Sequence, residues 1–183
     1  MCASWHADGV DISADARLLF PRTRVFTTYR DELVALLPFL PNVRRIEVTS
    51  RTDDGTIAKL VNEWHGGGEI PAAARAFISE SMLSWTDRAT WDETSFTCAW
   101  NIETHAFAEA VTCKGTNRFL EDGDATLLEI RGTLAIDAKK IRGVPGFLAG
   151  KVSKAVEELL VEKIQPNLVE VSRGLAKYLE QQG

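Results

Sequence analysis

Residues 143–160, GVPGFLAGKVSKAVEELL, open the stretch that decides the fold, because an amphipathic helix pattern begins there and continues toward the C-terminus. From Val144 to Leu179 apolar residues recur every three or four positions, the spacing of one helix face. Pro145 falls near the first turn, where a missing N–H is harmless, whereas Pro166 lies inside and is expected to kink or divide the helix. The sequence therefore predicts a long C-terminal helix with one buried face.

Ahead of this helix, strand patterns follow one another along the chain. Between Phe96 and Glu103 apolar residues alternate with polar ones, and this period of two is typical of an antiparallel sheet with one covered face. Gly55 and Gly123 each follow acidic residues and predict tight hairpin turns. A helix-compatible piece at residues 71–77 interrupts the series. The expected strands are residues 43–48, 57–64, 83–91, 96–103, 111–120 and 126–136.

The first forty residues predict one more strand and a short helix. Arg17–Phe26 is expected to form an opening strand that bends or lies at an edge, because Pro21 cannot donate to a ladder. Thr28 and Asp31 have the spacing of a capping box. Leucines at helical spacing follow, and Pro38 is expected to end that helix.

This order of elements predicts an α+β fold, in which a curved antiparallel sheet of six to seven strands wraps around the C-terminal helix. One helix cannot cover so wide a sheet unless the sheet curves, and an apolar cavity then remains between them. The chain resembles the helix-grip fold of the START-like (SRPBCC) superfamily, which includes Bet v 1-like proteins and polyketide cyclases. The resemblance rests on the order of elements, on PNVRRIEV at residues 41–48 and on the quoted residues 143–160. The resemblance spans about Arg17 to Leu179. It implies that a lipid, isoprenoid or polyketide-like molecule binds in the cavity.

Composition sets the class of protein. The 183 residues are 45% hydrophobic and 26% charged, as in ordinary globular domains, and the net charge of −5 argues against a nucleic-acid-binding face. The longest uncharged apolar run, Leu33–Val43, is shorter than the ~20 residues that span a bilayer. No secretory signal pattern is present, so a cytoplasmic location is expected. We expect residues 1–15 to form a loose leader and residues 16–183 a single START-like domain.

The cavity wall is predicted from the strand faces and the helix stripe. In a sheet that wraps around one helix, the same surface forms the core and the cavity wall. The aromatic residues on that surface can therefore fill the core or line the cavity. Asn62 and Asn117 share faces with Trp64 and Phe119, and we expect them to orient an otherwise apolar ligand. The predicted ligand-binding residues are Leu60, Asn62, Trp64, Trp85, Phe96, Trp100, Asn117, Phe119, Ile130, Val156 and Leu159.

Few residues have the pattern of reaction chemistry. The three histidines lack the spacing and companions of metal ligands, so neither a metal nor a cofactor is expected. Cys98 and Cys113 lie in strand patterns and are expected to be small buried residues. His105, near Glu103 and Glu109, is the candidate catalytic base, provided that it faces the cavity.

Three functions remain open at this point. A carrier or sensor of a hydrophobic small molecule is favoured, because apolar wall residues outnumber any catalytic set. The alternative is a cyclase- or hydrolase-type enzyme that uses His105, Asp87 or Asn62 in the same cavity. A third possibility is an interaction module that uses the end of the C-terminal helix, around Leu175 and Leu179. The oligomeric state is left open.

The segment Leu36–Pro41 is strongly apolar and has two interpretations. If exposed at the cavity mouth, it would suit transient contact with a membrane during ligand exchange. The favoured interpretation is that it turns inward and closes one end of the core, since large exposed apolar patches are rare.

Overall fold

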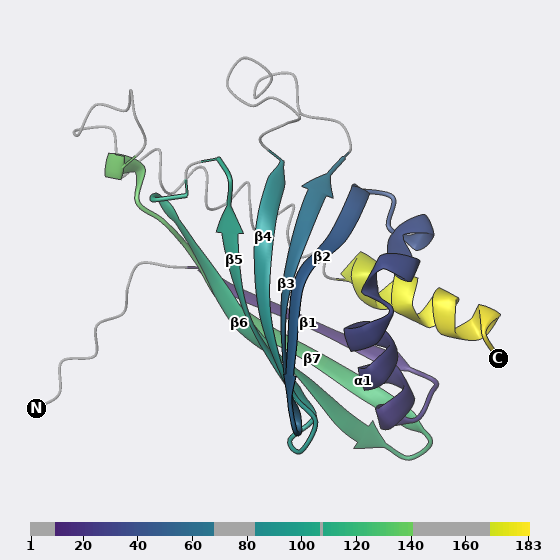
Figure 1. The fold of residues 1–183 in the computed structure, drawn as a ribbon. Helices are drawn as coiled ribbons and strands as arrows, with labels where there is room; N and C mark the ends of the chain where they lie inside the picture. The colour runs from purple at the N-terminus through teal and green to yellow at the C-terminus, as the bar shows by residue number, and fades with distance from the viewer. Residues whose placement is uncertain (1–9, 68–82, 107, 141–168) are drawn as a thin grey trace, which may run out of the picture.

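The computed structural model describes residues 10–67, 83–106, 108–140 and 169–183. These residues form one seven-stranded antiparallel sheet in the order β1-β7-β6-β5-β4-β3-β2 (Figure 1). Strands β2 to β7 pair with their neighbours along the chain, while the first strand pairs with the last. The strands are β1 (Val10–Leu18), β2 (Val43–Asp54), β3 (Ile57–Gly66), β4 (Ser84–Asp92), β5 (Thr97–Thr104), β6 (Val111–Asp122) and β7 (Ala125–Ile136).

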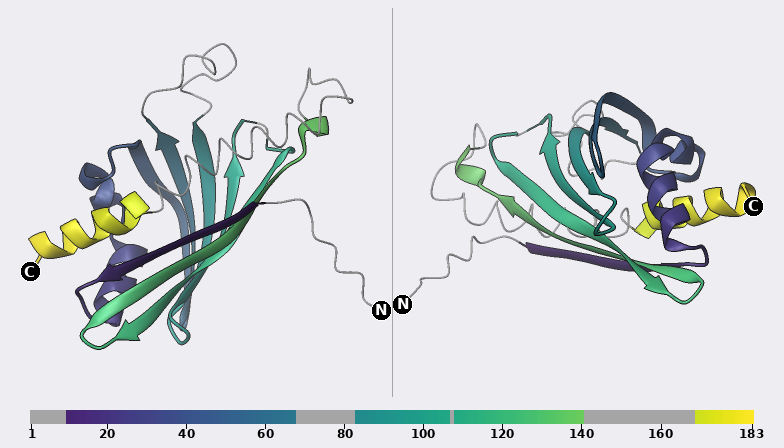
Figure 2. Two further views of the ribbon diagram at one scale, coloured as in Figure 1. Left: turned by 180° about the vertical axis from the view of Figure 1, so that it is seen from behind. Right: turned by 60° about the horizontal axis from the view of Figure 1, so that its bottom comes forward.

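Helical elements precede and follow the sheet. The α-helix α1 (Arg22–Asp31) and the 3-10 helix η1 (Leu33–Phe39) lie between β1 and β2, and a short 3-10 turn, η3 (Ala138–Lys140), follows β7. Residues 169–181 form a further helix, called the C-terminal helix below. Figures 1 and 2 show α1, η1 and this helix gathered at one side of the sheet, beside β2.

The predicted strands and hairpin turns are confirmed, with boundaries shifted by a few residues. Gly55 and Gly123 have φ of +60° and +64° in the turns after β2 and β6, a backbone region that side chains with a Cβ rarely adopt. At the turn between β4 and β5, the carboxylate of Asp92 accepts the N–H of Thr94 at 2.9 Å. Alternation and turn chemistry therefore identified this part of the fold from sequence.

One face of the sheet, the inner face, carries most of the buried side chains and the three helices. Phe26 of α1 is fully buried and meets Trp91, Phe96 and Phe119 edge to face, with ring centroids 5.2–5.3 Å apart. Ring pairs in this geometry contribute beyond their buried area. The end of the sheet nearest α1 is therefore packed with the protein's own aromatic rings.

The C-terminal helix packs against η1 and α1. Leu175 and Leu179 are 0% and 1% exposed. Gly174 makes the close approach possible, because a Cβ there would lie 2.9 Å from Leu40 Cδ2. Arg24 of α1 also donates to the Leu179 carbonyl at 3.2 Å. Leu175 and Leu179 are thus core residues of this chain, and the prediction that they anchor a partner protein is wrong.

The opening of the chain differs from its prediction. The strand is β1, from Val10, so residues 10–15 belong to the sheet rather than to a loose leader. Pro21 precedes α1 as its N-cap, because its fixed φ suits a helix start and its missing N–H costs nothing there. The expected capping box is also wrong, since Thr28 and Asp31 lie in the last turn of α1.

Other expectations fall outside the described residues. These are the helical piece at 71–77, most of the predicted long helix, and the effect of Pro166. None of the helices that the structure describes is long and apolar enough to cross a bilayer.

Candidate ligand-binding site

Most residues predicted to line the cavity share the inner face of the sheet. Phe96 lies in the turn before β5, and Val156 and Leu159 lie outside the described residues. A role in ligand binding remains a prediction for all of them. The residues on the inner face are Leu60, Asn62, Trp64, Trp85, Trp100, Asn117, Phe119 and Ile130.

These residues divide into two groups. Phe96 and Phe119 contact Phe26, while Ile130 and Leu60 are 2% and 3% exposed in the same core cluster. This group is packed against the protein's own helical elements. The remaining described residues lie on β3, β4, β5 and β6, and among them Trp64 and Trp85 stack with centroids 5.6 Å apart and planes 12° apart.

Polar atoms without partners gather in this second region. Asn62, which is 2% exposed, donates from Nδ2 to Asp87 Oδ2 at 3.2 Å, but its own Oδ1 accepts nothing. Asp87 Oδ1 is likewise buried without a partner, as are Trp64 Nε1 and Thr104 Oγ1. We call Asn62, Trp64, Asp87 and Thr104 the inner polar patch.

Strand register places the inner polar patch in two adjacent rows. Asn62 pairs with Asp87 across β3 and β4. In the next row, Trp64 pairs with Trp85, which in turn pairs with Thr104. Alternate residues of a strand share a face and lie about 7 Å apart, so the four groups lie together over three strands.

Asp87 is the acidic group of this region. Burial raises the pKa of its carboxyl to about 6, and the hydrogen bond from Asn62 lowers it only in part. A carboxyl group that titrates near neutral pH can accept or donate a proton under cellular conditions. The patch therefore combines two acceptor oxygens, an indole N–H and a hydroxyl, and one of the two oxygens belongs to the acid–base group of Asp87.

Trp100 forms a flat wall beside the patch. It pairs with Gly115, which pairs with Gly132. A Cβ on Gly115 would lie 2.3 Å from the indole ring, and one on Gly132 would lie 2.6 Å from it. The two glycines thus allow the ring to lie across β6 and β7. Its Nε1 donates to Asn117 Oδ1 at 2.9 Å, which fixes its orientation. Asn117 therefore positions Trp100.

Tyr29, Cys98 and Cys113, which also lie at the inner face, remain protonated near neutral pH. Burial raises the pKa of the Tyr29 hydroxyl above its ordinary range, with a further rise from Cys98 and Asp87. Burial also raises the pKa of the Cys98 thiol, and that of Cys113 to about 11. Since the thiolate is the nucleophile, neither cysteine is activated. No group of His, Cys, Asp or Glu in the described ranges is arranged to hold a metal ion.

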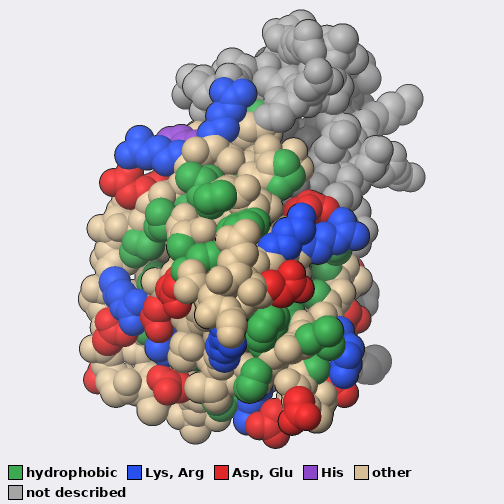
Figure 3. Space-filling view, turned by 90° about the vertical axis from the view of Figure 1, so that its right-hand side faces the viewer, with side chains coloured by type: hydrophobic (Ala, Val, Ile, Leu, Met, Phe, Trp, Pro, Cys, Tyr) green, Lys and Arg blue, Asp and Glu red, His purple; other side chains and the backbone are tan. Residues whose placement is uncertain are grey.

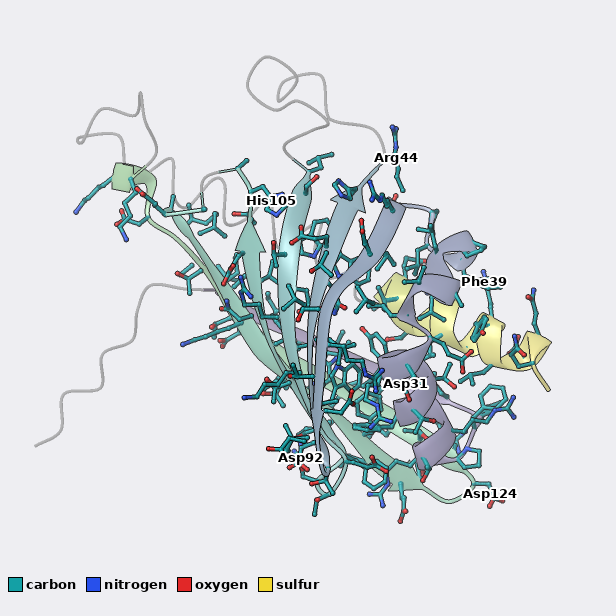
Figure 4. The ribbon with its side chains drawn as sticks, in the orientation of Figure 1. Asp31, Phe39, Arg44, Asp92, His105 and Asp124 are labelled. Atoms are coloured by element: carbon teal, nitrogen blue, oxygen red, sulfur yellow. The ribbon has the colours of Figure 1, made fainter. Side chains whose placement is uncertain are left out.

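His105 lies on the outer face, not with the inner polar patch. Its Nε2 is 2.9 Å from Thr86 Oγ1 and 3.1 Å from Glu63 Oε2. Thr86 and Glu63 are neighbours in sequence of Asp87 and Asn62, so they point to the opposite side of the sheet. Figure 4 shows His105 at the end of β5, an internal strand of the sheet. The condition under which His105 was a catalytic candidate is therefore not met.

The segment Leu36–Pro41 is mainly turned inward. Leu36 and Leu40 are buried, Leu37 and Phe39 are half-buried, and the two prolines are exposed. Figure 3 views the side where the helices lie and shows hydrophobic side chains in separate groups between charged ones. Membrane contact through this segment stays a prediction, which vesicle co-sedimentation can check.

Several solved structures are similar to this chain over nearly its whole length. The Zhui aromatase/cyclase from Streptomyces sp. R1128 has a TM-score of 0.68 at 17% identity, covering 95% of both chains. Norcoclaurine synthase from Thalictrum flavum, in complex with dopamine and hydroxybenzaldehyde, has 0.63 at 14%, covering 96% of this chain and 88% of that one. A START superfamily protein from Mycobacterium smegmatis has 0.55 at 13%, covering 94% and 99%. The chain has a START-like fold.

The START-like fold is shown by three-dimensional likeness. No protein-family model and no curated protein sequence matches the chain. Identities of 13–17% carry no residue roles across, because one fold serves many functions. Site residues in this START-like sheet therefore have to be argued from its own contacts.

Sequence reasoning missed part of the patch. The sequence patterns do not single out Thr104, and they indicate Asp87 only as a candidate group of an enzyme. A signal was present, since Asp87 stands between Trp85 and Ala89 in an alternating strand, at a position facing the core. A carboxyl group at such a position is rarely buried unless it is paired.

Proposed function

We propose that this protein binds a hydrophobic small molecule against the inner face of its sheet, in a cavity between the sheet and the long helix that the sequence predicts from Val144 to Leu179. The inner polar patch orients that molecule. The observation that carries the proposal is the set of four buried polar atoms without partners on an otherwise apolar wall. Each such atom costs about 1–3 kcal/mol when unpaired, and a bound molecule with polar groups would recover that cost.

The comparisons support a small-molecule role for the fold in general. Two of the similar structures are named as enzymes, and one is a complex with two small aromatic molecules. We favour binding or carriage over catalysis, because the patch holds one acid–base group and no activated nucleophile. We further propose that residues 16–183 form a single domain of a cytoplasmic protein. No specific lipid, isoprenoid or polyketide follows from the fold.

Native mass spectrometry of the purified full chain, followed by solvent extraction, tests this function. We expect a co-purifying apolar molecule, or saturable binding of the neutral fluorescent probe N-phenyl-1-naphthylamine. Asn62→Leu is expected to change the probe's affinity or emission maximum, because it alters the patch. Thr90→Val on the outer face is the matched control and should leave both unchanged. If nothing co-purifies and the probe does not bind, the proposal is wrong.

A second function has one specific observation in its favour. The carboxyl group of Asp87, with its pKa raised to about 6 by burial, is suited to move a proton on a bound molecule. A cyclase- or hydrolase-type reaction would then depend on Asp87 rather than on His105. Turnover of any accepted substrate should fall about 100-fold or more in Asp87→Asn. Unchanged turnover would leave only the binding function.

A further inference from the structure

The unpartnered atoms of the inner polar patch define what a ligand has to supply. Asn62 Oδ1 and Asp87 Oδ1 are acceptors, and the hydrogen bond from Asn62 Nδ2 goes to Asp87 Oδ2, not to Oδ1. Trp64 Nε1 is a donor, and Thr104 Oγ1 is both. A neutral hydroxyl group both donates and accepts, so it can pair with one of the acceptor oxygens and with Trp64 Nε1 at once. An ammonium group only donates and leaves Trp64 Nε1 unpaired, and a carboxylate only accepts and leaves both acceptor oxygens unpaired.

The charge around the patch disfavours an anionic ligand. Among the described inner-face positions of β3, β4 and β5, Asp87 is the one charged residue. No Lys or Arg occupies any of these described positions. A ligand anion would meet this carboxylate with no compensating cation among the described inner-face residues, at a site where burial already disfavours charge. The inner-face positions nearest the patch are Leu60, Asn62, Trp64, Trp85, Asp87, Ala89, Trp100, Ile102 and Thr104.

The walls of the patch favour a flat molecule. Trp100 lies against two glycines on one face of its ring, so its other face is turned to the interior, and the residue is only half-buried. Ala89 pairs with Trp100 and lies two residues after Asp87 on β4. Its small side chain leaves space between the Trp100 ring and Asp87. The stacked pair of Trp64 and Trp85 bounds the other side. Aromatic rings gain from offset stacking with planar partners.

We propose that Asp87, held by Asn62, is a specificity-determining residue that selects neutral planar-ring ligands bearing a hydroxyl group. The hydroxyl hydrogen is donated to Asp87 Oδ1, and the ring lies against Trp100. This inference rests on the proposed function, because it names the ligand class of the same site. It goes further by assigning the selection to one carboxylate.

Isothermal titration of the full chain at pH 7.5 with a series of two-ring probes tests this. The probes are 2-naphthol, 2-methylnaphthalene, 2-decalol, 2-naphthoate and 2-naphthylmethylammonium. We expect 2-naphthol to bind about 10-fold more tightly than 2-methylnaphthalene, because a hydrogen bond to a charged group replaces an apolar contact. Tighter binding of 2-naphthol than of 2-decalol is expected from stacking on Trp100.

Variants locate the effect. Asp87→Asn keeps the shape and removes the charge, and should reduce the preference for 2-naphthol over 2-methylnaphthalene to about 3-fold or less. Glu103→Gln is the matched control, because Glu103 lies on the outer face of β5 and pairs with Arg88 there. It should keep the full preference. Trp100→Leu should lower the affinity for 2-naphthol relative to 2-decalol.

The outcomes separate the two proposals. If 2-naphthol and 2-methylnaphthalene bind equally, or if Asp87→Asn keeps the full preference, the inference is wrong while the binding function stands. Tighter binding of the carboxylate or of the ammonium probe than of 2-naphthol also overturns the inference. If none of the probes binds and N-phenyl-1-naphthylamine also fails, the proposed function itself is wrong.

Discussion

Asp87→Asn is expected to stabilise the protein above neutral pH, because the native carboxyl group is buried at a cost. Burial raises the folded-state pKa of Asp87 to about 6 from its ordinary value of 3.8. The folded chain therefore binds this proton more tightly than the unfolded chain does. Stability is lost as pH rises from 3.8 through about 6, and the loss is complete above that range.

The two pKa values set the magnitude. At pH 8 the difference between 3.8 and about 6 corresponds to about 3 kcal/mol of lost stability. At pH 4.5, where the folded carboxyl is still protonated, the same values correspond to about 1 kcal/mol. The variant amide carries no charge, and its oxygen can still accept from Asn62 Nδ2. Its advantage over the native chain should thus grow by about 2 kcal/mol between the two pH values.

Urea unfolding followed by tryptophan fluorescence at pH 4.5 and pH 8 measures this difference. Both proteins should have the same dependence on urea concentration, so the midpoints report stability. Glu103→Gln, at an exposed outer-face position, should change the free energy of unfolding by about 0.5 kcal/mol or less at either pH. A variant that is less stable than the native chain at pH 8, or a difference independent of pH, would refute the view that Asp87 is buried at a cost.

Three further substitutions test the packing by the same unfolding measurement. Phe26→Ala should cost about 3–5 kcal/mol, because it empties the centre of a fully buried aromatic cluster; a cost under about 1 kcal/mol would show that the cluster is loosely packed. Gly132→Ala should cost about 1–3 kcal/mol, since its Cβ would lie 2.6 Å from the Trp100 ring, and an unchanged midpoint would mean that the ring has another position. Trp100→Phe should cost about 1–3 kcal/mol by leaving Asn117 Oδ1 without its donor; no loss would show that water replaces the indole.

Local patterns predicted the strands well, and one helix start poorly. Gly55 and Gly123 identify their turns because the positive φ there is a local requirement that glycine meets. Pro21 is ambiguous in sequence, because a proline is compatible both with an edge strand and with the start of a helix. Only the packing of Phe26 against the sheet favours the helix, and that contact joins residues far apart in the chain.

The site shows the same division. Alternation correctly placed Asn62 and Trp64 on one face of β3, because that property belongs to a single strand. It could not show that Asn62 would pair with Asp87, since the pairing depends on the register between β3 and β4. Nor could it place His105, which follows the last residue of β5 and turns toward Thr86 on the outer face.

The amino-acid sequence by itself determined the local geometry of each segment, that is, the alternating strand faces and the glycine turns. It also determined the START-like order of the elements. These properties follow from interactions over a few residues. What the tertiary structure decided was which side chains become neighbours, and therefore which polar atoms lose their partners. Asp87 acquires its raised pKa, and Trp100 its flat position over two glycines, only after the strands are aligned. Burial and register are properties of the assembled sheet, so no single strand encodes them.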